Sequence, residues 1–309
     1  FGYYNIGRQM LSEPFLPNFI NDHRTPIYPL FLNSIMALSG NFGAEIGTRQ
    51  FLQGANVIVI VQSVIALLGL YLLYRTLLFL QINKRNAILY TLFTGINPML
   101  FVWERVLLTE SLTITWLIAT TYLFVLTLKE PRSGRFILLL LSFIFCFLLK
   151  PIYVALPFFL LPLIPLYQRN KHTLILTLIT GFAFLLIPLS YIKLNESLHG
   201  YRGINHISDI NILGRILQFK LPVESGRNIS FFYNSVIHYR SIGGDPMPYR
   251  FLEYYDPQIY IKTDRLNELQ AFTRTVMFHN LPLYVAKSLL DIPNALLAPN
   301  DIVSISSNG

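Results

Sequence analysis

The sequence predicts an all-α fold: a polytopic membrane helical bundle followed by an outward-facing segment that is mixed or mainly helical. The chain has 309 residues, 53% of them hydrophobic and only 13% charged, whereas a globular protein carries roughly 25% charged residues. The apolar residues concentrate between about residues 51 and 194. Basic residues cluster in the short connections between apolar runs, which is typical of membrane topology.

Charge and cysteine content exclude several other classes. The formal net charge is +8, but the Lys and Arg residues form no single stripe, so nucleic acid is not an expected partner. Cys146 is the single cysteine, which excludes an internal disulfide or a metal site built from several cysteines.

Residues 1–50 are predicted to be an outward-facing first loop with short interfacial helices. Pro26 and Pro29 prevent a continuous helix across Asn21–Pro29. The apolar stretch Leu30–Leu38 is shorter than the ~20 residues that span a bilayer. The turn before it carries three polar side chains, Asp22, His23 and Arg24.

Residues 51–194 are predicted to form a transmembrane bundle of about six helices. Several prolines predict kinked or broken helices, which lipid tolerates where neighbouring protein satisfies the freed backbone groups. The six apolar segments lie at about 51–80, 86–102, 107–128, 135–149, 151–167 and 173–193.

The connections predict the orientation of the bundle. Three connections are short and basic, and they alternate along the chain with the other connections. They are Gln81–Asn86, Lys129–Arg135 and Gln168–His172. The positive-inside rule assigns them to the cytoplasm. We therefore expect an integral protein of the bacterial inner (plasma) membrane whose active site faces outward. The charged residues expected on that outward face are Asp22, His23, Arg24, Glu104, Arg105, Glu110 and Lys150.

Residues 195–309 differ in composition, because charges, glycines and turn residues return there. Residues 264–280 have an amphipathic helical pattern, and Pro282 is suited to open another helix through Leu297. We expect an extracytoplasmic segment, and we expect it to be incomplete because no closing signal follows.

The densest group of ionisable residues lies between two hydrophobic runs. Glu104, Arg105 and Glu110 occupy a turn at the membrane surface, where a charge is costly unless it is paired or faces a wet cavity. Contact between helices is the structural alternative for Glu110. Arg24 and Lys150 are candidates for binding an anion, with snorkelling to the interface as the alternative for Lys150.

Other polar and aromatic residues could complete such a site. His23 could transfer a proton, but no paired histidine spacing accompanies it, so no tightly held metal is predicted. Whether a loosely bound divalent metal ion assists stays open. Aromatic residues could stack on a sugar or form the aromatic belt of the interface. They are Tyr3, Tyr4, Tyr28, Tyr153 and Trp103.

An ordered set of motifs resembles a known superfamily. Three motifs follow one another within roughly residues 1–195. They are Arg24-Thr-Pro-Ile-Tyr-Pro29, Asn97-Pro98 and Glu104-Arg-Val-Leu-Leu-Thr-Glu-Ser111. This order resembles the polyprenyl-phosphate-sugar-dependent glycosyltransferases of the GT-C fold, such as the protein O-mannosyltransferases and the lipid A aminoarabinose transferases. Phe1–Arg8 is similar to the Tyr-rich helix that follows their catalytic aspartate. The resemblance therefore implies a fragment that lacks the first membrane helix and this acid, and is itself inactive.

The resemblance implies transfer of a monosaccharide from a polyprenyl-phosphate donor to the hydroxyl or amine of an extracytoplasmic glycan, lipid or protein acceptor. By the same resemblance, Arg24 would bind the donor phosphate and Glu104 would support catalysis as a second outward acid. From their own chemistry we expect Lys150 and Arg105 to help bind the phosphate and Glu110 to support catalysis. The alternatives are a transporter or lipid flippase, or a non-catalytic protein that binds lipid phosphate. The further site candidates are Asp22, His23, Tyr28, Tyr4 and Arg8.

Overall fold

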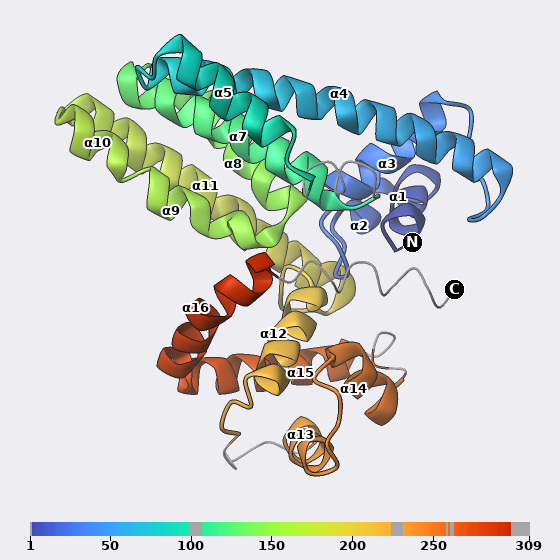
Figure 1. Ribbon diagram of the computed structural model, residues 1–309. Coiled ribbons are helices and arrows are strands. Elements are labelled where there is room, and N and C mark those ends of the chain that lie inside the picture. The colour runs from blue at the N-terminus through green and yellow to red at the C-terminus, as the bar shows by residue number, and fades with distance from the viewer. Residues whose placement is uncertain (1, 99–106, 224–230, 258, 260–262, 298–309) are drawn as a thin grey trace. The chain divides into compact units, whose positions relative to one another are not determined.

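A computed structural model describes residues 2–98, 107–223, 231–257, 259 and 263–297 (Figure 1). Within these residues the regular structure is helical and contains no strand, which confirms the predicted all-α class. The chain divides into two compact units, Phe1–Leu198 and His199–Gly309. The predicted boundary after residue 194 lies a few residues before this division. Residues 1–50 were predicted as a region of their own, and they belong to the first unit together with the bundle. The two units are described separately.

The first unit opens with three short helices, α1 (Gly2–Ser12), α2 (Phe15–Phe19) and α3 (Ile27–Leu38). Prolines set two of these boundaries, because Pro14 precedes the first residue of α2 and Pro26 that of α3. With 12 residues, α3 is too short to cross a bilayer, as the sequence predicted.

Helices α1 and α3 pack closely against each other at Gly7. A Cβ atom at this position would lie 2.2 Å from the Pro29 carbonyl oxygen, so only glycine allows the approach. Asn33 Nδ2 donates to the Tyr4 carbonyl at 2.9 Å and joins the two helices. The start of the chain is thereby fixed against the segment that leads into the bundle.

Within the described residues, four helical stretches are long and apolar enough to cross a membrane, and they identify a membrane protein. They are α4 (Arg49–Phe79), α7 (Thr109–Lys129), the stretch Pro151–Gln168 and α11 (Lys171–His199). Two further predicted segments form shorter helices, α5 (Lys84–Gly95) and α8 (Ser133–Leu149). The predicted number of about six therefore includes two helices that are shorter than a standard span.

The stretch Pro151–Gln168 is broken into three pieces, as its prolines predicted. A 3-10 helix η1 (Pro151–Ala155) is followed by α9 (Leu156–Leu160) and α10 (Leu163–Gln168). Prolines occupy the first turn of η1 and of α9, where a missing N–H costs no hydrogen bond.

Small and polar residues mediate the contacts between the long helices. A Cβ atom at Gly69 of α4 would lie 2.9 Å from Thr115 Cγ2 of α7, so the glycine admits the threonine. Between α7 and α8, the Thr120 and Ser142 hydroxyl oxygens lie 2.6 Å apart, and Trp116 Nε1 donates to the Ser142 carbonyl at 3.2 Å. Thr120 thus joins two helices, whereas Thr121 is exposed.

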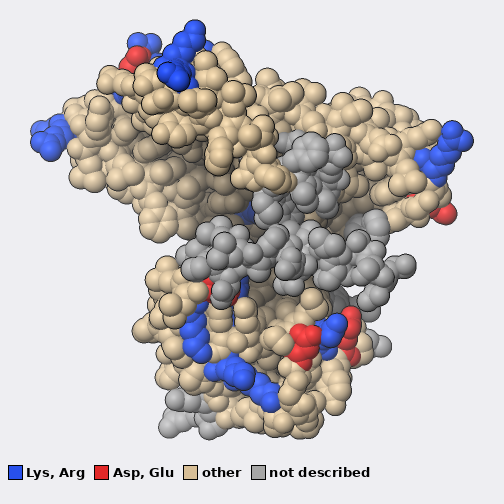
Figure 2. All heavy atoms as spheres, viewed as in Figure 1, with Lys and Arg blue, Asp and Glu red and all other residues tan. Residues whose placement is uncertain are grey.

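The three basic connections meet at one end of this unit, which we call the basic end. The Lys129 ammonium donates to the Phe79 carbonyl at the end of α4. Arg135 Nη1 donates to the Leu126 carbonyl at 2.9 Å. Gln168 Nε2 likewise donates to a carbonyl near the end of α7. In Figure 2 the charged spheres of this unit lie towards its ends, with a broad tan surface between them.

The second unit consists of α12 (His206–Gln218), α13 (Phe231–Ser241), α14 (Pro248–Tyr255), α15 (Thr263–His279) and α16 (Leu281–Leu297). Its hydrophobic core forms where α12 packs on α14 and α15. Leu266, Leu269 and Val276 of α15 are buried, as the amphipathic spacing predicted, and Met277 is only partly buried.

A buried polar network lies inside the second unit. The Tyr201 hydroxyl donates to the Asp209 carboxylate, and Gln270 Nε2 donates to Tyr201 at 3.0 Å. Burial raises the pKa of the Asp209 carboxyl. Arg240 donates to the carbonyls of Ile216 at 2.6 Å and Leu221 at 2.9 Å, which satisfies the end of α12. These contacts stabilise the unit's own fold.

Candidate functional site

The loop between α2 and α3 is fixed by hydrogen bonds at its base. Asn21 Oδ1 accepts the backbone N–H groups of His23 at 2.9 Å and of Arg24 at 3.2 Å, which forms an Asx turn. The Tyr191 hydroxyl of α11 bonds both the N–H and the carbonyl of Asn21 at 3.2 Å. Thr25 Oγ1 donates to the Leu149 carbonyl at the end of α8. These hydrogen bonds hold the backbone of the loop in place and so fix the positions from which its side chains extend.

Arg24 extends from this loop over an aromatic ring. Its guanidinium carbon lies 4.7 Å from the centroid of the Tyr3 ring, within the range of a cation–π contact. Among the described residues, no carboxylate forms an ion pair with Arg24. A guanidinium carries five N–H donors, and no carboxylate among the described residues engages those of Arg24, so they stay available for an anion.

Glu110 and Lys150 form an ion pair between α7 and α8. Lys150 Nζ lies 2.7 Å from Glu110 Oε1, and the two side chains keep 31% and 28% of their surface exposed. Glu110 lies in the first turn of α7 and Lys150 follows the last residue of α8, so each charge suits its helix dipole. Thr109 Oγ1 lies 3.3 Å from the second carboxylate oxygen of Glu110. The carboxylate is thereby oriented on both sides.

Tyr3 is close to Arg24 and feels the charge of Glu110. Burial raises the pKa of the Tyr3 hydroxyl; the Arg24 charge and a hydrogen bond with Thr109 oppose this shift, and the Glu110 charge adds to it. The Arg24 guanidinium and the Glu110 carboxylate are therefore both near one tyrosine. The structure thus brings together three predicted site residues, Arg24, Glu110 and Lys150, at the end of the unit opposite the basic end.

Tyr28 is a fourth predicted residue of this group. Its ring meets the Tyr3 ring edge-on, with centroids 5.1 Å apart. The side chain is fully buried, and its hydroxyl has no hydrogen-bond partner among the described residues. Burial raises the pKa of Tyr28, and the negative charge of Glu110 contributes to the shift. Burying a hydroxyl without a hydrogen-bond partner costs free energy of folding. A bond from this hydroxyl to a bound ligand would explain why a tyrosine stands here.

The remaining predicted residues lie elsewhere or are engaged. The Tyr4 hydroxyl donates to the Ala44 carbonyl at 2.9 Å inside the core, which gives Tyr4 a structural role. Arg8 is exposed on α1. Glu104 and Arg105 lie outside the described residues.

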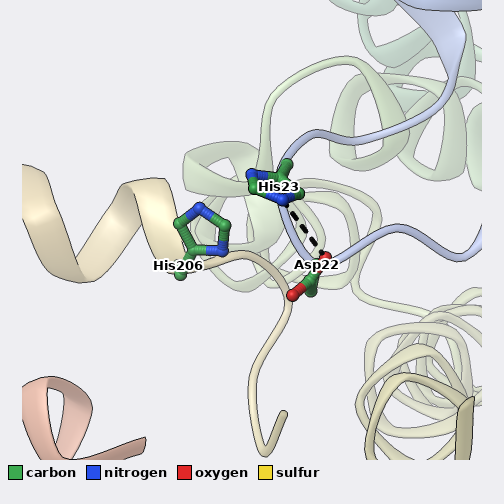
Figure 3. A group of neighbouring side chains, drawn as sticks. All are labelled: Asp22, His23 and His206. Atoms are coloured by element: carbon green, nitrogen blue, oxygen red, sulfur yellow. Dashed lines mark ion pairs between the residues drawn. The ribbon is translucent and has the colours of Figure 1, made fainter. Parts of the chain in front are cut away.

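Asp22 and His23 lie side by side on the loop that carries Arg24. Figure 3 shows their ion pair, with His23 Nε2 3.9 Å from Asp22 Oδ1. His206, also drawn there, belongs to the second unit, where it begins α12 and is buried. Asp22 and His23 alone offer two ligand atoms from one loop, fewer than a tightly held metal needs.

Several residues that shape the site were not among the predicted ones. The sequence predicts Tyr3 as a surface for a sugar or as part of the aromatic belt of the interface, and it assigns no site role to Thr109, Asn21 or Tyr191. Asn21 carries a local signal, because an asparagine that opens a polar turn favours an Asx turn. Tyr191 carries none, since its bond to Asn21 joins residues 170 positions apart.

Comparisons with known proteins found no matching family model, no matching curated protein and no matching solved structure.

Proposed function

We propose that this chain belongs to a membrane glycosyltransferase that moves a monosaccharide from a polyprenyl-phosphate donor to the hydroxyl or amine of an extracytoplasmic acceptor. The observation that supports this proposal is Arg24. Its guanidinium carbon lies 4.7 Å from the centroid of the Tyr3 ring, it forms no ion pair with a described carboxylate, and it lies near the Glu110–Lys150 pair. An anion binds well at such a cation, because the Glu110 carboxylate is already neutralised by Lys150.

The position of this group along the helices suits a lipid-borne phosphate. Helix α7 has 21 residues, which corresponds to ~31 Å, about the thickness of a bilayer's hydrocarbon core. Glu110 lies at its start and the basic end at its finish. If the basic end faces the cytoplasm, the site lies at the outer interface. A donor whose tail is in the bilayer carries its phosphate at that depth.

The proposed reaction exchanges one bond at the anomeric carbon of the sugar. The bond to the donor phosphate breaks, a bond to the acceptor oxygen or nitrogen forms, and polyprenyl phosphate leaves with the electron pair. Arg24 binds the phosphate oxygens, and Lys150 keeps two N–H donors after its bond to Glu110. Both stabilise the charge that develops on the leaving phosphate.

A carboxylate must accept the proton of the acceptor group. Glu110 is oriented by Lys150 and Thr109, which supports a role in positioning the acceptor. The resemblance assigns the proton transfer to an aspartate, with Glu104 as a second outward acid.

The experiment compares Arg24→Ala with the unchanged protein, using the whole protein in membrane vesicles and a radiolabelled polyprenyl-phosphate sugar. We expect Arg24→Ala to abolish covalent transfer while the protein is still inserted at normal amounts. Arg132→Ala is the matched control, because Arg132 is an arginine of a basic connection and 75% exposed; it should transfer normally.

Other results would point to the alternatives. Unchanged turnover in Arg24→Ala would remove Arg24 from the site. Movement of the labelled lipid between leaflets without a covalent product would indicate a flippase. If the protein binds the labelled lipid but neither transfers the sugar nor moves the lipid between leaflets, it is a non-catalytic lipid-phosphate-binding protein. The charged residues of the site gather at one end of the helices and not at their middle, which favours transfer over transport.

A further inference from the structure

We infer that α16 of the second unit docks on the bilayer through its exposed apolar face. The polarity of this helix is inverted relative to a helix on a water-soluble domain: its charged side chains face the protein, and the leucines whose side chains are described face outward. The inference concerns a different surface from the transferase site and does not rest on the proposed function.

The outward face of α16 is entirely apolar over the residues whose side chains are described. Two of its leucines are among the most exposed large apolar residues of the chain, Leu289 at 61% and Leu290 at 76%. At 3.6 residues per turn, the exposed residues form one continuous surface along the helix. Its exposed large apolar members are Leu281, Leu283, Val285, Leu289 and Leu290.

The opposite face of α16 is polar and is fixed to the second unit. The Lys287 ammonium donates to the Phe219 carbonyl at the end of α12. Asp291 Oδ2 lies 2.5 Å from Arg215 Nη1 of the same helix α12. Tyr284 meets the Phe219 ring, with centroids 6.1 Å apart. These contacts determine which way α16 faces, because rotating it to hide the leucines would break all three.

A helix that faces water normally has the reverse arrangement, with its charges outward and its apolar stripe against the core. Exposed apolar patches of this kind mark a contact with a membrane or another protein. The apolar face of α16 therefore requires a covering phase that is itself apolar.

The bilayer is that phase, because this chain is anchored in one. Helix α11, one of the four candidate membrane spans, ends at His199, and α12 begins at His206. The six residues between them reach at most ~20 Å when extended. The second unit is thus tethered close to a membrane surface whatever its orientation. The tether therefore keeps membrane lipid at a high local concentration around the second unit, whereas a partner protein must first be encountered.

The test places an environment-sensitive fluorophore on the face. Cys146 is the single cysteine of this sequence and is buried, so Cys146→Ala removes the competing thiol from these 309 residues. Leu289→Cys in that background is labelled with bimane, and the whole protein is reconstituted in phosphatidylcholine vesicles. Glu253→Cys on α14 is the control, because Glu253 is an exposed charged position of the same unit.

We expect the label at Leu289 to emit at shorter wavelength than the label at Glu253. Lipids brominated on their acyl chains should remove most of its emission, and aqueous iodide should leave it unchanged. The label at Glu253 should show the reverse. If Leu289→Cys fails to fold, Leu290→Cys on the same face provides the same readout.

Two outcomes would overturn the inference. Iodide quenching at Leu289 equal to that at Glu253 would show that the face is in water. Protection from both quenchers would show that protein covers it, and a dependence of that protection on the protein-to-lipid ratio would identify a second copy of this chain. None of these readouts depends on whether the protein transfers sugar.

Discussion

The two ends of the first unit contain similar charged side chains and use them in different ways. At the basic end, Lys129 and Arg135 donate to main-chain carbonyls, so their charges satisfy the ends of helices. At the opposite end, Lys150 pairs with the carboxylate of Glu110, and Arg24 lies on the Tyr3 ring. The charges of the basic end are bonded to the chain's own carbonyls and stabilise the fold. The charges of the opposite end include an ion pair that stays partly exposed, where a ligand can reach it.

The largest effect is expected from Lys150→Met. This change leaves Glu110 partly buried without its counter-ion, which should cost about 1–2 kcal/mol of unfolding free energy, given the pair's partial exposure. Sugar transfer should be lost, because a cation beside the phosphate and the orientation of Glu110 are both removed. Thermal unfolding of the whole protein in detergent and the vesicle transfer assay measure the two effects.

The control for this prediction is the double variant Glu110→Gln/Lys150→Met. Since neither charge remains, most of the lost stability should return while transfer stays absent. Normal transfer in Lys150→Met would show that the pair is only structural, and the contrast between the two ends would disappear.

A smaller effect is expected from Arg24→Lys. Lysine keeps the positive charge but loses the planar fork that matches phosphate oxygens and part of the contact with the Tyr3 ring. We expect transfer to fall by about tenfold, which corresponds to ~1.4 kcal/mol, with insertion in the membrane unaffected. Arg132→Lys at the basic end is the matched control. Equal activities for these two variants would contradict a specific role for the Arg24 guanidinium.

Tyr28→Phe separates function from stability at the same site. The hydroxyl has no partner among the described residues, so its removal should leave unfolding unchanged or raise the unfolding free energy by up to about 1 kcal/mol. If the hydroxyl bonds the donor or acceptor during the reaction, transfer should fall about fivefold to tenfold, the value of one hydrogen bond. Full activity would make Tyr28 a residue of the core alone.

Much of the fold could be predicted because its signals are local. Apolar runs located the long helices, and prolines located the breaks in Pro151–Gln168 and the start of α3. The basic connections predicted which helix ends meet, since each joins an apolar segment to the next. Helix lengths were less predictable: α5 ends at Gly95, whereas its apolar run continues to residue 102.

The contacts of the site depend on residues far apart in the chain. Glu110 and Lys150 are separated by 40 positions, and each was predicted singly without the other as its partner. The sequence also placed Lys150 as a free cation for phosphate, whereas one of its three donors is engaged by Glu110. The inverted polarity of α16 could not be predicted from the sequence either. A helical period predicts that two faces differ, but only packing against α12 determines which face is covered.

The smallest effect is expected at the basic end, from Arg135→Ala. This change removes the bond to the Leu126 carbonyl and the ion pair with Glu130 at 2.9 Å. Glu130 is largely exposed, so the cost should be about 0.5–1 kcal/mol. Transfer should be unchanged, because α7 separates this end from the site by about 20 residues, or ~30 Å. Unfolding in detergent and the transfer assay again provide the measurements. If transfer falls by more than the loss of stability can explain, the two ends act together. The assignment of a structural role to the basic end and a ligand-binding role to the opposite end would then be wrong.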